Sequence, residues 1–313
     1  MAVKYVFGVD LGGTTVKLGL FDISGEVLDK WEIVTRKENQ GSLILGDIAD
    51  SIKEKMKERS LSTEEVAGVG IGVPGPVKED GTVLKCANLG WGIFNVADEL
   101  SKLVQMPVKV GNDANVAALG EMWQGGGKGY QNVVMVTLGT GVGGGIIING
   151  KMIAGTNGAG GEIGHVRVDY QEEDVCGCGK KGCLEQYSSA TGIVRIAKKT
   201  LSACDTPSTL RDIDEITCKD IFDQAKAGDA LALQSVDTLG DYLGTALANV
   251  ACVADPEVFV IGGGVSKAGD FLLEAIKKNY IPNAFHACRE AEFKLATLGN
   301  DAGIYGSAKL ILE

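Results

Sequence analysis

Apolar positions follow a strand period and then a helix period in the first sixty residues. Residues 5–10, 16–21 and 27–35 are short apolar or β-branched runs separated by glycine turns, which predicts an antiparallel start. Residues 44–57 differ, because Ile44, Ile48, Ile52 and Met56 recur every four residues while lysines and glutamates occupy the other positions. This spacing predicts an amphipathic helix.

The same order of strand, turn and helix recurs further along the chain. Residues 66–73 read as a buried strand that ends in Pro74, Gly75 and Pro76, and 108–110 as a short strand. A second cycle begins near Asn132, so the pattern predicts two α/β domains that form a ligand cleft. The further strands expected are 133–138, 146–148 and 258–261, and the further helices 94–104, 116–123, 189–201, 230–254, 270–278 and 302–312.

Composition and charge narrow the class of protein. The 313 residues are 45% hydrophobic and 23% charged, as in an ordinary globular enzyme, and the net charge of -11 argues against nucleic acid and anionic membranes as partners. The start shows no secretory signal, and no run approaches about 20 apolar residues. We therefore expect a cytoplasmic protein whose eight cysteines are reduced thiols or metal ligands.

A first glycine turn lies at residues 10–17, DLGGTTVK, between two predicted strands. Its glycines can present consecutive backbone N–H groups, and Thr14 and Thr15 add hydroxyl donors, which suits an anion. Asp10 suits a Mg²⁺ ion held through water. The alternative is a plain hairpin with an aspartate in its turn.

A second glycine turn lies at residues 138–145, LGTGVGGG. Gly139, Gly141 and Gly144 have the spacing of a dinucleotide fingerprint, and Glu162 lies further on. That fingerprint requires a helix after the glycines, whereas 146–148 predict a strand. A second phosphate loop with Thr137 and Thr140 fits better.

The third glycine cluster, Gly262 to Gly264, lies between a predicted strand and a predicted helix. That position lets the backbone approach a flat adenosine. A tight strand-to-helix turn is the alternative.

The candidate catalytic base lies in the segment NDAN, where a short strand meets a helix. Either Asn112 or Asp113 could simply cap that helix. In the functional interpretation Asp113 stays ionised in the helix field and accepts a hydroxyl proton, while Asn112 hydrogen-bonds a neighbouring sugar oxygen. Phosphoryl transfer needs little more than such positioning and charge neutralisation.

A metal cluster is predicted from CGCGKKGC and the preceding GGEIGH. Cys176, Cys178, Cys183 and His165 would complete a tetrahedral, structural zinc site, with free thiols or a disulfide as the alternatives. Glu162 and Glu185 flank the cluster, and carboxylates are good acceptors for sugar hydroxyls.

Taken together the motifs resemble the ROK family, and within it the bacterial sugar kinases that act on glucose. DLGGTTVK, GVPGPV, NLGW, NDANVAALGE, LGTGVGGGI, GGEIGH, CGCGKKGCLE and IGGG occur in the family's order over nearly the whole chain. The resemblance implies an actin-like, ribonuclease-H-like fold with two α/β domains around a cleft. We expect domains at 1–117 plus 301–313 and at 118–300, the latter with the zinc-binding loop.

The resemblance also implies roles for particular residues. Asp113 is the expected base. The expected ligands of the protein are ATP, Mg²⁺, structural Zn²⁺ and glucose or a related hexose. The chain is expected to form a homodimer or homotetramer. Polyphosphate is an alternative donor, and N-acetylmannosamine, mannose and fructose are alternative acceptors. The expected sugar ligands are Gly75, Asn88, Asn112, Asp113, Glu162, His165 and Glu185. The expected nucleotide ligands are Asp10, Gly12, Gly13, Thr14, Thr15, Lys17, Gly139, Thr140, Gly141, Gly262, Gly263 and Gly264.

Two other classes of protein compete with a kinase. The family includes sugar-sensing repressors with an added N-terminal DNA-binding module, for which the position of Asp10 leaves no room. An actin-like ATPase without a sugar substrate would not need the set formed by Asn112, Asp113, Glu162, His165 and Glu185.

Overall fold

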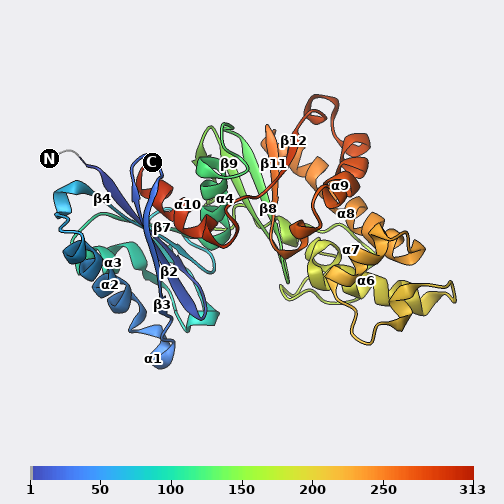
Figure 1. The fold of residues 1–313 in the computed structure, drawn as a ribbon, viewed down its shortest axis with the longest axis horizontal. Helices are drawn as coiled ribbons and strands as arrows, with labels where there is room; N and C mark the ends of the chain where they lie inside the picture. The colour runs from blue at the N-terminus through green and yellow to red at the C-terminus, as the bar shows by residue number, and fades with distance from the viewer. Residues whose placement is uncertain (1–2) are drawn as a thin grey trace. The chain divides into compact units, whose positions relative to one another are not determined.

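The computed structural model describes residues 3–313, coloured along the chain in Figure 1. Its contacts divide the chain into two compact units. The domain boundaries expected from the sequence, at 117/118 and 300/301, remain a prediction. The contact division differs from them in keeping 118–131, 145–161 and 298–300 with the first unit. The first unit is Met1–Gln131, Gly145–Gly161 and Leu298–Glu313, and the second is Asn132–Gly144 and Glu162–Thr297.

The first unit is built on a sheet with strand order β3-β2-β1-β4-β7. β1 pairs antiparallel with β2 and parallel with β4, and β4 pairs parallel with β7. The strands are β1 (Tyr5–Leu11), β2 (Thr15–Asp22), β3 (Val27–Val34), β4 (Val66–Val73) and β7 (Val108–Asn112), with a hairpin of β5 (Thr82–Val83) and β6 (Phe94–Asn95). The helices are α1 (Glu38–Gly41), α2 (Ile44–Glu58), α3 (Val96–Val104), α4 (Asp113–Gln124) and α10 (Ala302–Ile311).

Alternate residues of β1 serve the two faces of this sheet. Phe7, Val9 and Leu11 are buried in the core cluster that contains α2 and α3. The intervening residues face α10, because Val6 packs with Ile304 and Ala308. This alternation follows from the period of two in a strand, and it places Asp10 on the face toward α10.

Helix α10 packs unusually close to the sheet and to α4 (Figure 1). A Cβ atom at Gly70 would overlap the backbone carbonyl of Ser307, and one at Gly306 would overlap the carbonyl of Val116. Glycine is therefore required at both positions. The Ser307 hydroxyl donates to the Val9 carbonyl over 2.8 Å, which fixes α10 along β1.

The second sheet has the strand order β10-β9-β8-β11-β12. β8 pairs parallel with β11, and β11 pairs parallel with β12. Its strands are β8 (Val133–Leu138), β9 (Val142–Ile148), β10 (Lys151–Met152), β11 (Val258–Gly262) and β12 (Glu292–Leu295). The helices of the second unit are α5 (Glu185–Ser188), α6 (Ala190–Ala203), α7 (Cys218–Lys226), α8 (Ala230–Ala254) and α9 (Asp270–Asn283).

Most of the predicted elements are confirmed within a few residues, including a strand rather than a helix after the second glycine turn. The prediction for 94–104 is wrong at its start: Phe94 and Asn95 form β6, and the helix begins at Val96 because the Asn95 side chain accepts from the Asp98 N–H over 2.9 Å. α7 and β12 were not predicted. Within residues 3–313 no helix is long and apolar enough to cross a bilayer.

Candidate active site and metal centre

Three parallel strands of the first unit end at one edge of its sheet. In the ladder, Asp10 lies opposite Gly72, and Gly72 lies opposite Gly111. Because these strands run in the same direction, their carboxyl ends bring together Asp10, the turn after β4 that contains Gly75, and the start of α4. The predicted first-unit residues Asp10, Gly75, Asn112 and Asp113 thus share one edge.

Asn112 is the N-cap of α4, and Asp113 is its first helical residue. The Asn112 side-chain oxygen accepts from the N–H groups of Ala114 and Asn115 at 3.0 and 3.2 Å. Its amide group donates to the Gly75 carbonyl over 3.1 Å. The capping interpretation of Asn112 is therefore confirmed, and Asp113 lies in the first turn, where the helix field favours a carboxylate.

Asp10 lies near the end of β1, just before the first glycine turn, and its carboxyl group packs against α10. A Cβ atom added to Gly303 of α10 would lie 2.5 Å from the Asp10 carboxyl carbon. Burial and then the charge of Asp113 raise the pKa of Asp10 to about 6, against the opposing effect of Lys17. The charge of Asp113 thus acts on the Asp10 carboxyl group.

The first glycine turn closes through the backbone. The Gly12 N–H donates to the Thr15 carbonyl over 3.0 Å. Thr35, a buried residue that the sequence interpretation missed, donates its hydroxyl to the Gly12 carbonyl over 2.8 Å and its N–H to the Thr14 carbonyl over 3.0 Å. Thr14 is exposed in this turn.

Two further predicted residues have neighbours that define their surroundings. The Lys17 ammonium group donates to the Asn300 carbonyl over 2.9 Å. Asn88 is exposed on a turn that Cys86 and Trp91 close by paired backbone hydrogen bonds of 3.1 and 3.0 Å. Burial raises the pKa of the Cys86 thiol, and the charge of Asp113 adds to this, so the Asn88 turn starts close to the candidate base.

The second glycine turn is held by the start of α6. The Gly139 N–H donates to the Gly141 carbonyl over 3.0 Å, and the Ala190 N–H donates to the Gly139 carbonyl over 2.8 Å. The Thr191 hydroxyl donates to the Thr140 carbonyl over 2.8 Å. Thr191 carried no signal in the sequence, because it lies about fifty residues from the turn.

The third glycine cluster lies against the second glycine turn. Gly263 has a φ of +83°, and a Cβ atom there would overlap the backbone of Leu138. A short 3-10 helix, Gly264–Ala268, follows and precedes α9. Gly139, Thr140, Gly141 and Gly262 to Gly264 therefore gather at one edge of the second sheet.

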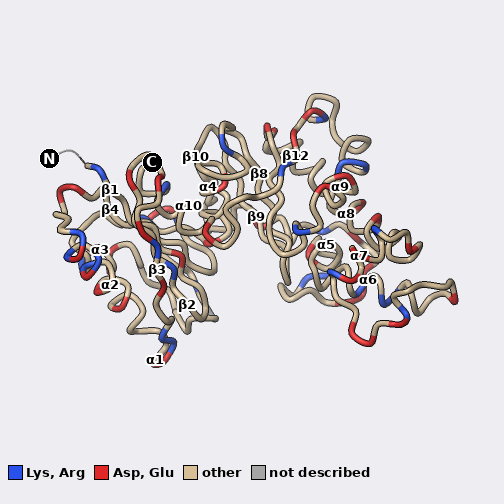
Figure 2. The backbone as a smooth tube through the Cα atoms, viewed as in Figure 1, with Lys and Arg blue, Asp and Glu red and all other residues tan. Residues whose placement is uncertain are grey.

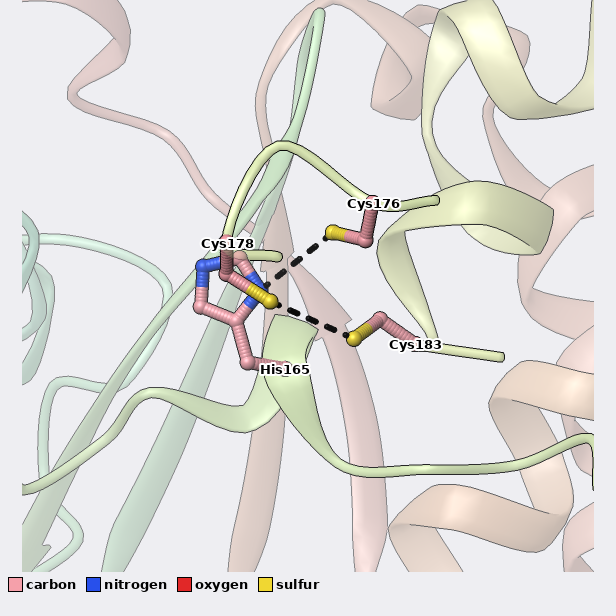
Figure 3. Close-up of side chains that lie close together, drawn as sticks. All are labelled: His165, Cys176, Cys178 and Cys183. Atoms are coloured by element: carbon pink, nitrogen blue, oxygen red, sulfur yellow. Dashed lines mark hydrogen bonds between the residues drawn. The ribbon is translucent and has the colours of Figure 1, made fainter. Parts of the chain in front are cut away.

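The four predicted metal ligands converge, as Figure 3 shows. One ligand atom from each of His165, Cys176, Cys178 and Cys183 lies within 4.8 Å of all the others. The Sγ atoms of Cys178 and Cys183 are 3.6 Å apart, and Cys176 Sγ is 3.8 Å from His165 Nδ1. Zn–S bonds of about 2.3 Å in a tetrahedron separate two sulfurs by about 3.8 Å, so the donor set fits zinc.

The cysteines are not paired as disulfides. Burial raises the pKa of the Cys183 thiol to about 12, and hydrogen bonds with Cys178 and Cys176 act in the same direction. A cation bound by the four ligands would favour the thiolate form of Cys183.

The candidate sugar ligands of the second unit surround this cluster. His165 directs Nδ1 toward Cys176, and its Nε2 lies 3.9 Å from a Glu162 carboxylate oxygen. One Glu185 oxygen accepts from the Val142 N–H over 3.0 Å, and the other lies 3.7 Å from Cys176 Sγ. Glu185 thus links the metal cluster to the second glycine turn.

The predicted residues therefore form two sets. The first unit contains Asp10, the first glycine turn, Gly75, Asn88, Asn112 and Asp113; the second contains the other two glycine clusters, the metal cluster, Glu162, His165 and Glu185. Figure 2 shows basic and acidic residues interspersed along both units, which agrees with the net charge of -11. Small anions would thus be bound by local backbone donors.

Two sheets of matching strand order, each with a glycine turn between its first two strands, define a protein of the phosphate-binding actin-like class. The ROK family model matches residues 6–313. The chain therefore belongs to the ROK family, and it has the actin-like fold of two α/β domains found in the sugar kinases of that family.

Individual relatives match over their full length. The chain is 46% identical over 318 residues to a glucokinase of Halalkalibacterium halodurans, covering 100% of this chain and 96% of the relative. It is 36% identical over 316 residues to a glucokinase of Thermotoga maritima, covering 98% and 97%. A solved ROK family glucokinase from Streptomyces griseus, in complex with glucose and AMPPNP, superposes with a TM-score of 0.73 at 35% identity, covering 98% of each chain.

Proposed function

We propose that this protein is an ATP-dependent glucokinase that transfers the γ-phosphoryl group of ATP to the 6-hydroxyl of glucose. Full-length similarity to glucokinases supports the class of reaction. The observation that carries the proposal is the position of Asp113, in the first turn of α4 at the sheet edge that also holds Asp10. Such an aspartate can orient and deprotonate an attacking hydroxyl.

In this mechanism Asp113 accepts the proton of the 6-hydroxyl as its oxygen attacks the γ-phosphorus, and ADP leaves with the bridging oxygen. Asn112 holds the turn at Gly75 while it caps α4, so the base and its neighbouring turn keep a fixed geometry. Mg²⁺, when bound, neutralises the negative charge of the phosphate oxygens. Asp10 is the residue that would hold it, through water.

The second unit supplies hydroxyl recognition and nucleotide binding. Glu162, Glu185 and Nε2 of His165 are acceptors or donors suited to sugar hydroxyls. Zinc held by His165, Cys176, Cys178 and Cys183 would fix the imidazole orientation, and so leave Nε2 for the sugar. The second glycine turn would cradle phosphates, and Gly262 to Gly264 would approach the adenosine.

The test is a coupled assay with glucose, mannose, fructose, N-acetylmannosamine and N-acetylglucosamine as acceptors, each with ATP and with polyphosphate. We expect the highest kcat/KM for glucose with ATP. A preference for another acceptor or donor would replace that part of the proposal, and ATP hydrolysis independent of sugar would overturn it.

The base is tested by Asp113→Asn. We expect kcat to fall by about 10²–10⁴-fold, while the glucose dissociation constant measured by calorimetry changes by less than about threefold. Asp98, an acidic residue in the first turn of α3, provides the matched control, and Asp98→Asn leaves turnover unchanged. Near-normal turnover of the Asp113→Asn variant would exclude Asp113 as the base.

A further inference from the structure

The loop that carries the metal ligands has an outer half without any ligand. Residues 169–174 lie between His165 and Cys176 and carry Asp169, Glu172, Glu173 and Asp174. The inner half closes by backbone pairing, with 2.7 Å bonds from Val168 N–H to Gly182 and from Cys176 N–H to Lys180. The outer half is held in a different way, by charged and aromatic side chains.

Glu172 is the centre of these contacts. Its side chain is 6% exposed, accepts from the Tyr187 hydroxyl over 2.6 Å, and pairs with Arg195 Nη1 over 2.7 Å. Burial by itself would raise the pKa of Glu172, but the Tyr187 hydroxyl, the Asp174 N–H and Arg195 lower it to about 2. The carboxylate is therefore charged and paired throughout the neutral range.

Arg195 connects Glu172 to the backbone beside Glu185. Its Nη2 and Nε donate to the Gln186 carbonyl over 3.0 and 3.3 Å, and its Nη1 donates to Asp174 over 2.9 Å. The guanidinium also lies 5.1 Å from the centre of the Tyr187 ring. One arginine on α6 thus fixes both the outer loop and the residue that follows Glu185.

Tyr187 extends the cluster to α8. Its ring stacks on Tyr242 with centroids 3.9 Å apart. The Tyr242 hydroxyl donates to an Asp169 oxygen over 3.3 Å, and the same oxygen lies 2.8 Å from the Tyr187 hydroxyl oxygen. Gln186 closes the other side, because its amide accepts from the Cys183 N–H and donates to the Asp174 carbonyl, both over 3.0 Å. The outer loop is therefore anchored to three helices.

We propose that Glu172, Tyr187 and Arg195 are positioning residues for the sugar site, forming a second brace of the metal-ligand loop that holds Glu185 in place. The inference rests on the proposed function, because it assigns a purpose to the sugar ligands of the second unit. Contacts that involve no metal ligand carry it: Glu172 to Tyr187 and Arg195, and Arg195 to the Gln186 carbonyl.

The first test is Glu172→Gln, which keeps the shape of the side chain but removes its charge. We expect the glucose KM to rise about three- to tenfold, with kcat and the ATP KM within about twofold of wild type and zinc per chain unchanged. Asp237 pairs with Lys278 at the surface of the same unit, and Asp237→Asn is the matched control. An unchanged glucose KM, or a rise that accompanies loss of zinc, overturns the proposal.

A second measurement tests the brace without relying on the proposed glucokinase activity. Amide hydrogen exchange of the protein as purified should show residues 169–174 protected in wild type and exchanging at least about tenfold faster in Glu172→Gln. Tyr187→Phe keeps the stacked ring and removes only the hydroxyl, and serves if Glu172→Gln does not fold. Equal exchange in wild type and variant overturns the brace, whereas a wild-type protein inactive on glucose overturns only the proposed function.

Discussion

The two larger sheets place different chemistry on the same framework. Their strand orders correspond, with β1, β2 and β4 of the first matching β8, β9 and β11 of the second. The registers at the glycine turns also correspond: Asp10 lies opposite Gly72, and Thr137 lies opposite Gly262. Where the first sheet presents a half-buried carboxylate, the second presents a neutral hydroxyl.

The units also differ in how their sites are held. In the first unit helix α10 lies so close to β4 and α4 that only glycine fits at Gly70 and Gly306. In the second unit a loop is held by cysteines, an imidazole and the Glu172 cluster. The comparison indicates that backbone packing fixes the candidate base, whereas polar side chains fix the candidate sugar ligands.

The largest expected effect comes from substituting Asp10 and Thr137, the residues at matching positions of the two sheets. Asp10→Asn should lower kcat at least about 10²-fold, because a carboxylate that holds Mg²⁺ contributes several kcal/mol. Thr137→Val at the matching position should mainly raise the ATP KM, by less than about tenfold. Coupled assays over a range of Mg²⁺ concentrations measure kcat and the ATP KM of both variants. Equal losses of kcat in the two variants would show that the two glycine turns do not have different functions.

Removing a metal ligand tests the second unit alone. Cys178→Ser should reduce zinc well below one ion per chain and raise the glucose KM at least about tenfold, since metal binding is coupled to local folding. Elemental analysis and the coupled assay measure the two quantities. Cys252, exposed on α8, is the control, and freshly purified wild type without zinc would contradict the assignment.

Substituting Gly72 and Gly262, which lie opposite Asp10 and Thr137 in the two sheets, should have smaller effects. A Cβ atom at Gly72 would lie 2.6 Å from Val116 Cγ2, whereas one at Gly262 would lie 3.1 Å from Ala296 Cβ and from Met135 Cε. The overlap at Gly72 is the deeper one and falls on a stiff valine side chain, whereas Ala296 and Met135 need to shift by only a few tenths of an ångström. Gly72→Ala should therefore destabilise by about 1–3 kcal/mol and Gly262→Ala by less than about 1 kcal/mol, as urea denaturation will show; the reverse order would contradict the packing described.

A further expected effect is a pH dependence of stability in the first unit. The folded chain raises the pKa of Asp10 from 3.8 to about 6, so between these values the folded state binds the proton more tightly than the unfolded state. The free energy of unfolding should therefore fall by about 1–3 kcal/mol as the pH rises from about 4 to above 6. Denaturation of wild type and Asp10→Asn without Mg²⁺ measures it, and parallel pH profiles would exclude it.

Local signals in the sequence predict much of this molecule. Strand and helix periods located the elements of both sheets, and the glycine turns mark where strands such as β1 and β8 end. The metal ligands lie within nineteen residues of one another, so their convergence could be inferred. β12 was missed because four residues, Glu292–Leu295, are too short to show a period.

Long-range partners carried no such signal. Thr35 supports the first glycine turn from the end of β3, and Arg195 reaches Glu172 from α6. Each is an ordinary polar residue in its own segment, and its partner becomes apparent only when the chain has folded. The sequence therefore predicts which groups carry chemistry better than which groups hold them.

The close packing of α10 has a consequence for biosynthesis. β1 is among the first segments to leave the ribosome, yet the helix that covers one of its faces is made about 290 residues later. At about 5–20 residues per second, the nascent first unit exposes that apolar face for some 15 to 60 seconds, while the second unit has all its residues by position 297. We therefore expect the second unit to complete its folding before the first unit, and chaperones to act mainly on the first unit.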